Sequence, residues 1–367
     1  MKISCEIIGK VDSGDVSKIS MENNNGVVIS TLTTGATLQE FLVPTETGAL
    51  KNIVLGFSDY EDYYKNNLCA CQSIGRVAGR IGKASYTHNM VLYSLPKNEG
   101  ENCLHGGPKG MQVQNWNYVT NLNDEYVETK FIRRLYSSVD GFPGDVTVSI
   151  SYRLNNNNRL TILFEAFDVT ESTVFNPTNH VYFNLSDKQD LSSHELQIYS
   201  DYRLELDSEL IPTGQKINVD GTNYDFRKTT DLLPRIEANN GFDDAFVVGG
   251  ETCDHVKEVA VLHDKESGDG IEIFSNRNGL VIYTMDNIED NIYFARDRGT
   301  IAKGREAIAM EAQTLPDAVN HTDFGDIILE EGHSVSYEIG FQYFNSSKQS
   351  CFSKSLVKTT KTIDDLN

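Results

Sequence analysis

The chain has 367 residues, with 32 Lys and Arg against 53 Asp and Glu, which gives a formal net charge of −21. This charge argues against nucleic-acid binding, because phosphate contacts need clustered Lys and Arg. It also disfavours anionic membranes, and it is compatible with a neutral small molecule. We therefore expect neither nucleic acid nor a membrane among the partners.

Cysteine usage and the polar N-terminus bear on the compartment. Six cysteines are too few for a disulfide scaffold in a chain of this length, so free thiols in a reducing compartment are expected. The N-terminus lacks the apolar segment of a signal peptide, and no window approaches about 18 uninterrupted apolar residues. These features predict a soluble, cytoplasmic protein.

The hydrophobic pattern has a period of two residues in most of the chain, which is typical of β-strands. The best candidate for a helix is the short segment 60–67. Residues 146–152 and 160–164 alternate on both sides of four asparagines, which predicts a β-hairpin because Asn tolerates left-handed turn conformations. Further strands are expected at 259–262, 271–274, 280–284 and 335–343.

Many short strands separated by turn signals predict an all-β sandwich or barrel with few short helices. The chain shows no internal repeat and no linker rich in Pro, Gly and Ser. We therefore expect one domain over residues 1–345. The alternation is lost after it, so residues 346–367 are predicted to form a tail or a surface extension.

The motifs of several enzyme classes are absent. The sequence has no GxxxxGK[ST], HExxH or GxSxG motif, and no strand–GxGxxG–helix unit. No two of the eight histidines are spaced i, i+2 or i, i+4. We therefore expect neither a metal site nor a cofactor.

Several candidate polar residues lie beside glycines or turns. Arg76 and Arg80 in SIGRVAGRI are planar donor forks that can hold two oxygens, or else ordinary salt-bridge partners. His105 precedes two glycines, where backbone can approach a ligand closely, although a loop histidine without a role has the same pattern. His180 in NPTNHVYFNL suits either a strand lining a wet cavity or an internally bonded histidine.

Two carboxylates complete the candidates. Asp243 in GFDDAFVV is by itself an ordinary acidic turn residue. Glu311 is embedded in the small apolar run AIAMEA, and an isolated buried charge is costly. A pKa perturbed by burial is what a catalytic acid or base needs, although a structural ion pair remains open.

Taken together, these strings resemble those of the aldose 1-epimerase family, the galactose mutarotases. The resemblance runs in order from about Thr34 to Phe344, and its most specific parts are GRVAGRI, LHGGPKG, TNHVYFNL and the run Glu311–Ala318. It implies an all-β fold, a large single-domain β-sandwich of the galactose mutarotase-like supersandwich type. It also implies interconversion of the α and β anomers of free hexoses, galactose and glucose, without metal or cofactor.

Residue roles are carried over by motif. The resemblance implies that Glu311 is the base on the C1 hydroxyl and His180 the acid on the ring oxygen, and that Arg76 is structural. We expect His180, beside carboxylates, to favour its protonated form, and Glu311 to stay ionised. The implied sugar-binding positions are Arg80, His105, Asp243 and, in the cleft wall, Tyr182.

The sequence departs from the commonest family pattern at Gly79, Asp244 and Val281, where many members carry Asn, His, and Gln or an aromatic residue. These departures leave the sugar preference open, as is the choice between monomer and homodimer. Maltose or another free reducing sugar is an alternative substrate. A sugar-phosphate epimerase, a non-catalytic carbohydrate-binding sandwich and a metal-dependent hydrolase or isomerase are less well supported, because the charge, the paired acid and base, and the histidine spacing respectively argue against them.

Overall fold

The computed structural model describes residues 1–250, 255–289 and 291–347. Within these ranges the chain forms 28 strands and two α-helices, α1 (Ser137–Asp140) and α2 (Leu232–Asn239), so the predicted all-β class is confirmed. The helix expected at 60–67 is a five-residue 3-10 helix, η1 (Tyr60–Tyr64). The sequence analysis did not predict α2. The remaining 3-10 helices are η2 (Gly82–Ala84), η3 (Met111–Val113), η4 (Ala295–Asp297) and η5 (Ala318–Asn320).

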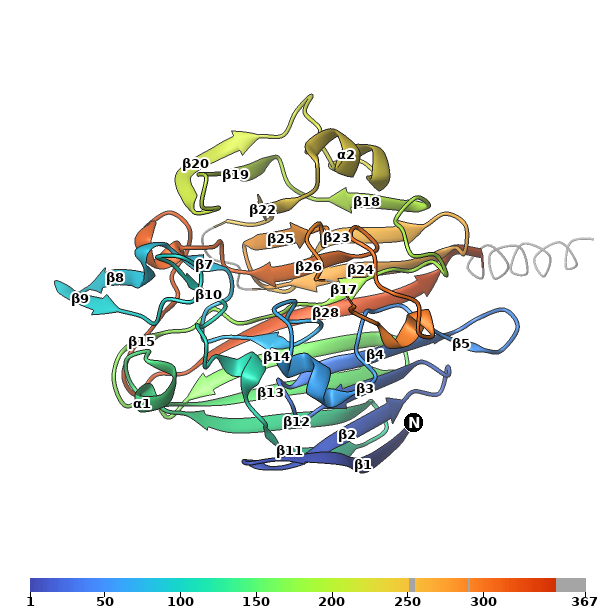
Figure 1. The fold of residues 1–367 in the computed structure, drawn as a ribbon, viewed down its shortest axis with the longest axis horizontal. Helices are drawn as coiled ribbons and strands as arrows, with labels where there is room; N and C mark the ends of the chain where they lie inside the picture. Colours follow the sequence, from blue (N-terminus) through green and yellow to red (C-terminus); the bar gives the residue numbers. More distant parts are fainter. Residues whose placement is uncertain (251–254, 290, 348–367) are drawn as a thin grey trace, which may run out of the picture.

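A nine-stranded antiparallel sheet runs through the molecule (Figure 1). The predicted hairpin, β13 (Val146–Asn155) and β14 (Arg159–Phe167), is confirmed in this sheet. The strand expected at 335–343, β28 (Val335–Asn345), lies between β14 and β24 and so joins the two halves of the sheet. The other members are β11 (Asn117–Leu122), β12 (Tyr126–Leu135), β18 (His194–Ile198), β21 (Thr230–Asp231), β23 (Lys257–Asp264) and β24 (Asp269–Ser275).

A six-stranded sheet positions the candidate site residues. Its order is β17-β26-β25-β22-β19-β20. Its register places Val281 opposite Glu311 and Asp243 opposite Tyr283. The strands are β17 (Tyr182–Phe183), β19 (Tyr202–Leu206), β20 (Pro212–Asn218), β22 (Asp243–Val247), β25 (Gly279–Tyr283) and β26 (Ile308–Gln313).

The N-terminal strands form a five-stranded sheet that packs on the nine-stranded one. In Figure 1 the blue strands of this sheet overlie the green β12–β14, and apolar residues of both sheets belong to the same buried core. The Tyr152 hydroxyl crosses the interface and donates to the carbonyl of Ala36 at 2.6 Å. The strands are β1 (Lys2–Val11), β2 (Gly14–Glu22), β3 (Val28–Leu32), β4 (Thr37–Pro44) and β5 (Leu50–Asn52).

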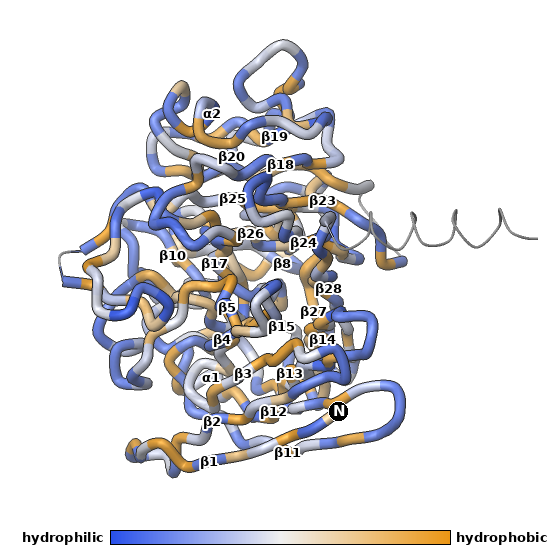
Figure 2. The backbone as a smooth tube through the Cα atoms, turned by 90° about the vertical axis from the view of Figure 1, so that its right-hand side faces the viewer, coloured by the Kyte–Doolittle hydropathy of each residue, from blue (hydrophilic) through white to orange (hydrophobic). Residues whose placement is uncertain are grey.

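Eight short strands pair two by two and carry the loops around the site. Hydrophobic stretches lie mostly along the interior strands, whereas many loops at the outline are hydrophilic (Figure 2). The pairs are β6 (Ser73–Ile74) with β16 (Thr178–Asn179), β7 (Arg80–Ile81) with β10 (Cys103–Leu104), β8 (Ser85–His88) with β9 (Val91–Ser94), and β15 (Thr173–Val174) with β27 (Ile328–Leu329).

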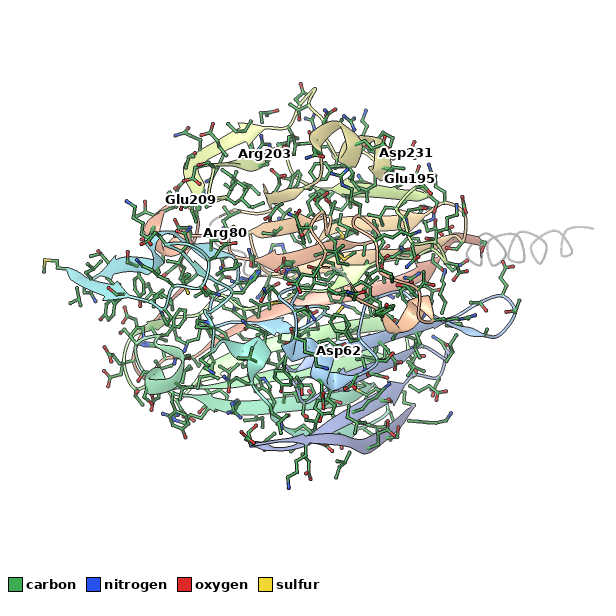
Figure 3. The ribbon with its side chains drawn as sticks, viewed as in Figure 1. Asp62, Arg80, Glu195, Arg203, Glu209 and Asp231 are labelled. Atoms are coloured by element: carbon green, nitrogen blue, oxygen red, sulfur yellow. The ribbon has the colours of Figure 1, made fainter. Side chains whose placement is uncertain are left out.

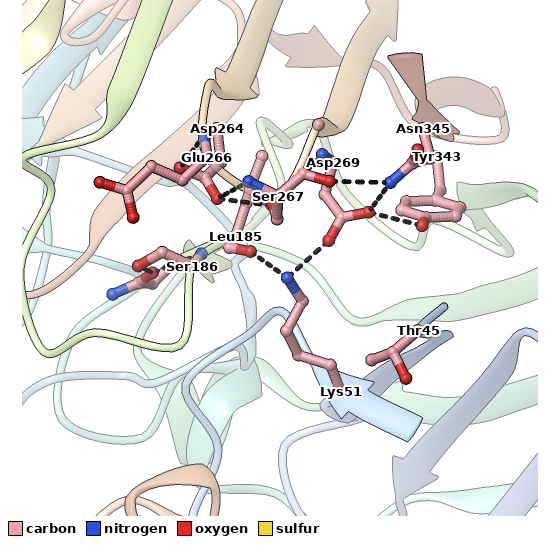
Figure 4. A network of polar contacts seen from close by, with 12 residues as sticks. Thr45, Lys51, Leu185, Ser186, Asp264, Glu266, Ser267, Asp269, Tyr343 and Asn345 are labelled. Carbon is pink, nitrogen blue, oxygen red and sulfur yellow. Dashed lines mark hydrogen bonds and ion pairs between the residues drawn. The ribbon is translucent and has the colours of Figure 1, made fainter. Parts of the chain in front are cut away.

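A buried polar network fastens the N-terminal sheet to the rest of the molecule (Figure 4). Lys51 on β5 forms an ion pair with Asp269 on β24 at 2.5 Å and donates to the carbonyl of Leu185 at 2.6 Å. Asp269 also accepts hydrogen bonds from Tyr343 and Asn345, both at 2.7 Å. Because a buried charge is tolerated only when it is paired and hydrogen-bonded, this network fixes the relative placement of β5, β24 and β28.

None of the helices in the described part of the chain is long and apolar enough to cross a membrane. From residue 348 on, the extension predicted over 346–367 lies outside the described residues. The division into a domain of residues 1–345 and a tail stays a prediction.

Candidate active site

The six predicted site residues all line one cavity of about 560 Å³. They come from separate parts of the chain and from both the six-stranded sheet and the short strand pairs beside it. Arg80 is labelled in Figure 3 at the end of the molecule where β7 and β10 lie. The residues brought together in this cavity are Arg80, His105, His180, Tyr182, Asp243 and Glu311.

Glu311 and His180 meet in the buried part of this cavity. Glu311 lies on β26, and its Oε1 is 3.3 Å from Nε2 of His180; their side chains are only 3% and 7% exposed. The backbone of His180 is held on both sides, because its N–H donates to Gln72 and its carbonyl accepts from Cys71. Oε2 of Glu311 has no hydrogen-bond partner among the described residues, so it is available to a ligand.

Burial dominates the protonation of this pair. It raises the pKa of Glu311 well above its usual value, with a further rise from Asp243 and an opposing effect of Arg80. Burial also lowers the pKa of His180 to about 4. The expectation of a protonated His180 beside an ionised Glu311 is therefore wrong for the empty site, because desolvation disfavours both charges.

His105 sits on a backbone that only glycines could follow closely. It has a φ of 52°, and a Cβ at the next residue, Gly106, would lie 2.0 Å from the carbonyl oxygen of Gly75. The N–H of Gly79 donates to His105 Nδ1 at 3.2 Å, which leaves the proton of the neutral ring on Nε2. Burial lowers the pKa of His105 well below its usual value, followed by effects of His180 and Arg80, so the ring is a neutral donor.

Arg80 lies between two carboxylates. Its Nε and Nη2 donate to the two carboxylate oxygens of Glu99 at 2.7 and 3.0 Å. Its Nη1 lies 3.4 Å from Oδ2 of Asp243, at the limit of a hydrogen bond. Burial raises the pKa of Asp243, and Arg80 partly offsets the rise. Sequence reasoning missed Glu99, which lies in a Gly-containing turn with no motif to mark it.

Tyr182 forms part of the cavity wall and supports the histidine. Its hydroxyl donates to the carbonyl of Leu68 at 3.1 Å, and its ring centroid is 4.8 Å from that of His180. The tyrosine thus joins the loop that carries Leu68 to the ring of His180.

The three positions that depart from the family pattern, Gly79, Asp244 and Val281, also line the cavity. Asp244 lies 3.5 Å from Arg203, and burial raises its pKa to about 6. Val281 is the strand neighbour of Glu311, so an apolar side chain stands next to the candidate base.

Arg76 has a different environment from Arg80. It is fully buried, and its Nε and Nη2 donate to Asp140 at 2.8 and 3.1 Å. Its Nη1 donates to the carbonyls of Pro143 and Gly144. These contacts agree with the structural interpretation of Arg76.

In the part of the chain that the structure describes, no three His, Cys, Asp or Glu side chains gather as a metal site would require. The four cysteines within that part, Cys5, Cys69, Cys71 and Cys103, are not joined in disulfides. Burial raises the pKa of Cys69 to about 12, which keeps this thiol protonated near the cavity.

Comparisons with known proteins agree with this geometry. The family model described as aldose 1-epimerase matches residues 17–342. An aldose 1-epimerase from Streptococcus thermophilus is 94% identical over 348 residues, which cover 95% of this chain and 100% of that protein. A maltose epimerase from Levilactobacillus brevis is 37% identical and covers 94% of this chain and 99% of that protein.

A solved structure shows the same fold. The crystal structure of a galactose 1-epimerase from Lactobacillus acidophilus superposes with a TM-score of 0.82 at 26% identity, covering 94% of this chain and 99% of that one. The all-β supersandwich expected from the sequence is thereby confirmed. Fold, cavity and relatives together show that this chain belongs to the aldose 1-epimerase family and is an isomerase.

Proposed function

We propose that this enzyme interconverts the α and β anomers of free hexoses, galactose and glucose, with Glu311 and His180 as the acid–base pair. The observation that carries the proposal is the 3.3 Å contact between His180 Nε2 and Glu311 Oε1 in the buried part of a polar cavity. A site that only bound sugar would have no need for such a pair.

The reaction requires two proton transfers. Glu311 takes the proton of the C1 hydroxyl, while His180 gives a proton to the ring oxygen as the bond between C1 and that oxygen breaks. The resulting aldehyde turns about the C1–C2 bond, and the two transfers run backwards to close the other anomer. Positioned proton transfer of this kind typically contributes about 10²–10⁴-fold to the rate.

The pair supplies both groups from a single shared proton. In the empty site burial opposes charge on either residue, so the proton lies on the carboxyl of Glu311. A C1 hydroxyl that donates to Glu311 and a ring oxygen that accepts from His180 both stabilise the charged arrangement. Substrate binding thereby moves the proton across the 3.3 Å contact to His180, which readies the acid and the base together.

The remaining site residues hold the sugar. Arg80 and the neutral His105 donate hydrogen bonds to sugar oxygens, and Asp243 accepts hydrogen bonds from sugar hydroxyls. Tyr182 packs against the ring of His180 and keeps the acid in place. Because the sugar is uncharged, this set of neutral and oppositely charged groups binds it without net attraction or repulsion.

A second candidate substrate is maltose. The support is the maltose epimerase that is 37% identical over nearly the whole chain, together with a cavity of about 560 Å³ that also reaches loop residues 287–289. In a reducing disaccharide the anomeric ring would occupy the same acid–base site, and the second ring would lie toward this loop.

Polarimetry of freshly dissolved α-galactose, α-glucose and maltose tests both candidates. We expect the enzyme to hasten the decay to the same final rotation, with or without EDTA, and the order of rates identifies the preferred sugar. A Glu311→Gln variant prepared in the same way is the matched control and is expected to be nearly inactive. If none of the three sugars decays faster, the proposed substrates are wrong.

We further propose that the enzyme works in the cytoplasm as a monomer or homodimer. The support is the absence of an apolar leader in the sequence and a chain mass of 41.0 kDa that is self-contained around one cavity. Light scattering of the purified enzyme separates one copy from two, and a larger assembly would contradict the proposal.

A further inference from the structure

Glu99 and Asp243 compete for one guanidinium at the edge of the cavity. Glu99 takes two of the donors of Arg80 at 2.7 and 3.0 Å, which is the paired geometry that makes Arg–carboxylate contacts strong. Asp243 receives only the 3.4 Å contact from Nη1. The fork is therefore committed to Glu99 and only touches Asp243.

The loop that carries Glu99 is fastened to the strands of the site. The N–H of Asn102 donates to the carbonyl of Glu99 at 2.9 Å, and the side chain of Asn98 binds both the N–H and the carbonyl of Leu104. Leu104 is the strand partner of Arg80. Glu99 is thus held at a fixed distance from the guanidinium and does not swing in from solvent.

The three charged side chains are only partly exposed, at 16% for Arg80, 37% for Glu99 and 32% for Asp243, and all three line the cavity. A sugar that enters removes the remaining water from them. Hydroxyl groups can then bind Asp243 only if its oxygens are not already taken by the guanidinium, because a doubly bonded Arg–carboxylate pair leaves few acceptor positions.

We infer that Glu99 is a positioning residue, which holds Arg80 away from Asp243 so that both groups stay available to the sugar. Without Glu99, the freed edge of the guanidinium turns to Asp243 and closes the 3.4 Å contact into a doubly bonded ion pair. The sugar must then break that pair before it can bind. The inference rests on the proposed function for the identity of the ligand, and it adds a residue that touches no reacting atom.

Kinetics of Glu99→Gln on the sugar that the wild type turns over fastest test this inference. We expect KM to rise about tenfold, which is the equivalent of one charge-assisted hydrogen bond, while kcat changes little. Glu101→Gln is the matched control, because Glu101 lies in the same loop but pairs with Lys97 and is 74% exposed. It should keep the wild-type KM.

A double-mutant cycle separates positioning from a general structural effect. In an Asp243→Asn background there is no carboxylate for Arg80 to capture, so adding Glu99→Gln should cost no further KM. Glu99→Asp keeps the charge and should restore most of the wild-type KM. The inference is overturned if Glu99→Gln has the wild-type KM, if its effect persists in the Asp243→Asn background, or if Glu99→Asp is no better than Glu99→Gln at equal Tm.

The failure of this inference can be told apart from failure of the proposed function. A wild type that turns over none of the sugars disproves the proposed substrates, whatever the variants do. The same comparison of variants is then read from galactose Kd values by calorimetry, where the same tenfold loss is expected. A wild type that neither turns over nor binds sugar overturns both.

Discussion

His180 Nε2 and Glu311 Oε1 lie 3.3 Å apart, and both side chains are almost completely buried. Burial lowers the pKa of the imidazole and raises the pKa of the carboxyl, so the pair holds one proton between two uncharged groups. The empty site therefore stores the acid and the base in neutral form. The charged form that the reaction needs arises only when a substrate supplies hydrogen bonds in place of water.

Neutral replacements of this pair should abolish turnover and leave the fold intact. Glu311→Gln and His180→Asn each remove a proton-transfer group, so we expect kcat to fall by about 10²–10⁴-fold. Neither change introduces a buried charge, so the Tm should stay near that of the wild type. Glu338→Gln on β28, whose carboxylate is paired with Arg159 and not with the cavity, is the control. Near-normal kcat in both variants would remove the catalytic assignment.

Tyr182 offers a test of support by the cavity wall. Tyr182→Phe keeps the ring on His180 but leaves the carbonyl of Leu68 without its donor, so unfolding free energy should fall by about 1 kcal/mol with kcat close to normal. Tyr182→Ala also removes the ring, and kcat should fall by up to about 100-fold because the acid is no longer held. Urea denaturation and polarimetry measure the two effects. Equal kcat values for the two variants would contradict this role of the ring.

Arg76 should matter for stability and not for catalysis. Arg76→Ala leaves Asp140 buried without its cation, which typically costs about 3–5 kcal/mol of unfolding free energy. Activity per folded molecule should remain near the wild-type level, because Arg76 does not line the cavity. Urea denaturation together with active-site-normalised rates checks this. A large fall in kcat at unchanged stability would show that the residue serves the site directly.

The buried His194 predicts how stability depends on pH. Burial lowers its pKa to about 4, with Asp264 partly opposing the shift, while its Nε2 accepts from the N–H of Leu185 at 2.9 Å. The unfolded chain takes up this proton near its ordinary pKa of about 6.5, whereas the folded chain does so only near 4. Unfolding free energy should therefore fall as the pH is lowered through this window, by about 3 kcal/mol for this residue.

His194→Gln provides the comparison for that prediction. Glutamine can still accept a hydrogen bond from Leu185 but carries no titrating group. The loss of unfolding free energy between pH 6.5 and 4.5, measured by urea denaturation, should be smaller in the variant than in the wild type. Identical pH dependence of the two proteins would mean that His194 titrates alike in the folded and unfolded chains.

Local sequence determined the strands most clearly. Alternation along residues 146–164 specified the hairpin of β13 and β14, because the period of two places alternate side chains on the buried face and the asparagines supply the turn. The motif strings likewise marked the six residues that the fold gathers around one cavity. The run 60–67 also contained its helix, although a Cys- and Asn-rich continuation limits it to a 3-10 turn of five residues.

The sequence by itself determined the all-β class, the strand pattern and the identity of the groups around the cavity. Only the tertiary structure decided their protonation and their partners. The neutral state of His180 and Glu311 arises from desolvation, which depends on how many segments pack around them. The pairing of Arg80 with Glu99 depends on a loop fastened 19 residues away. Burial and long-range contact are properties of the packed chain, so no local pattern could supply them.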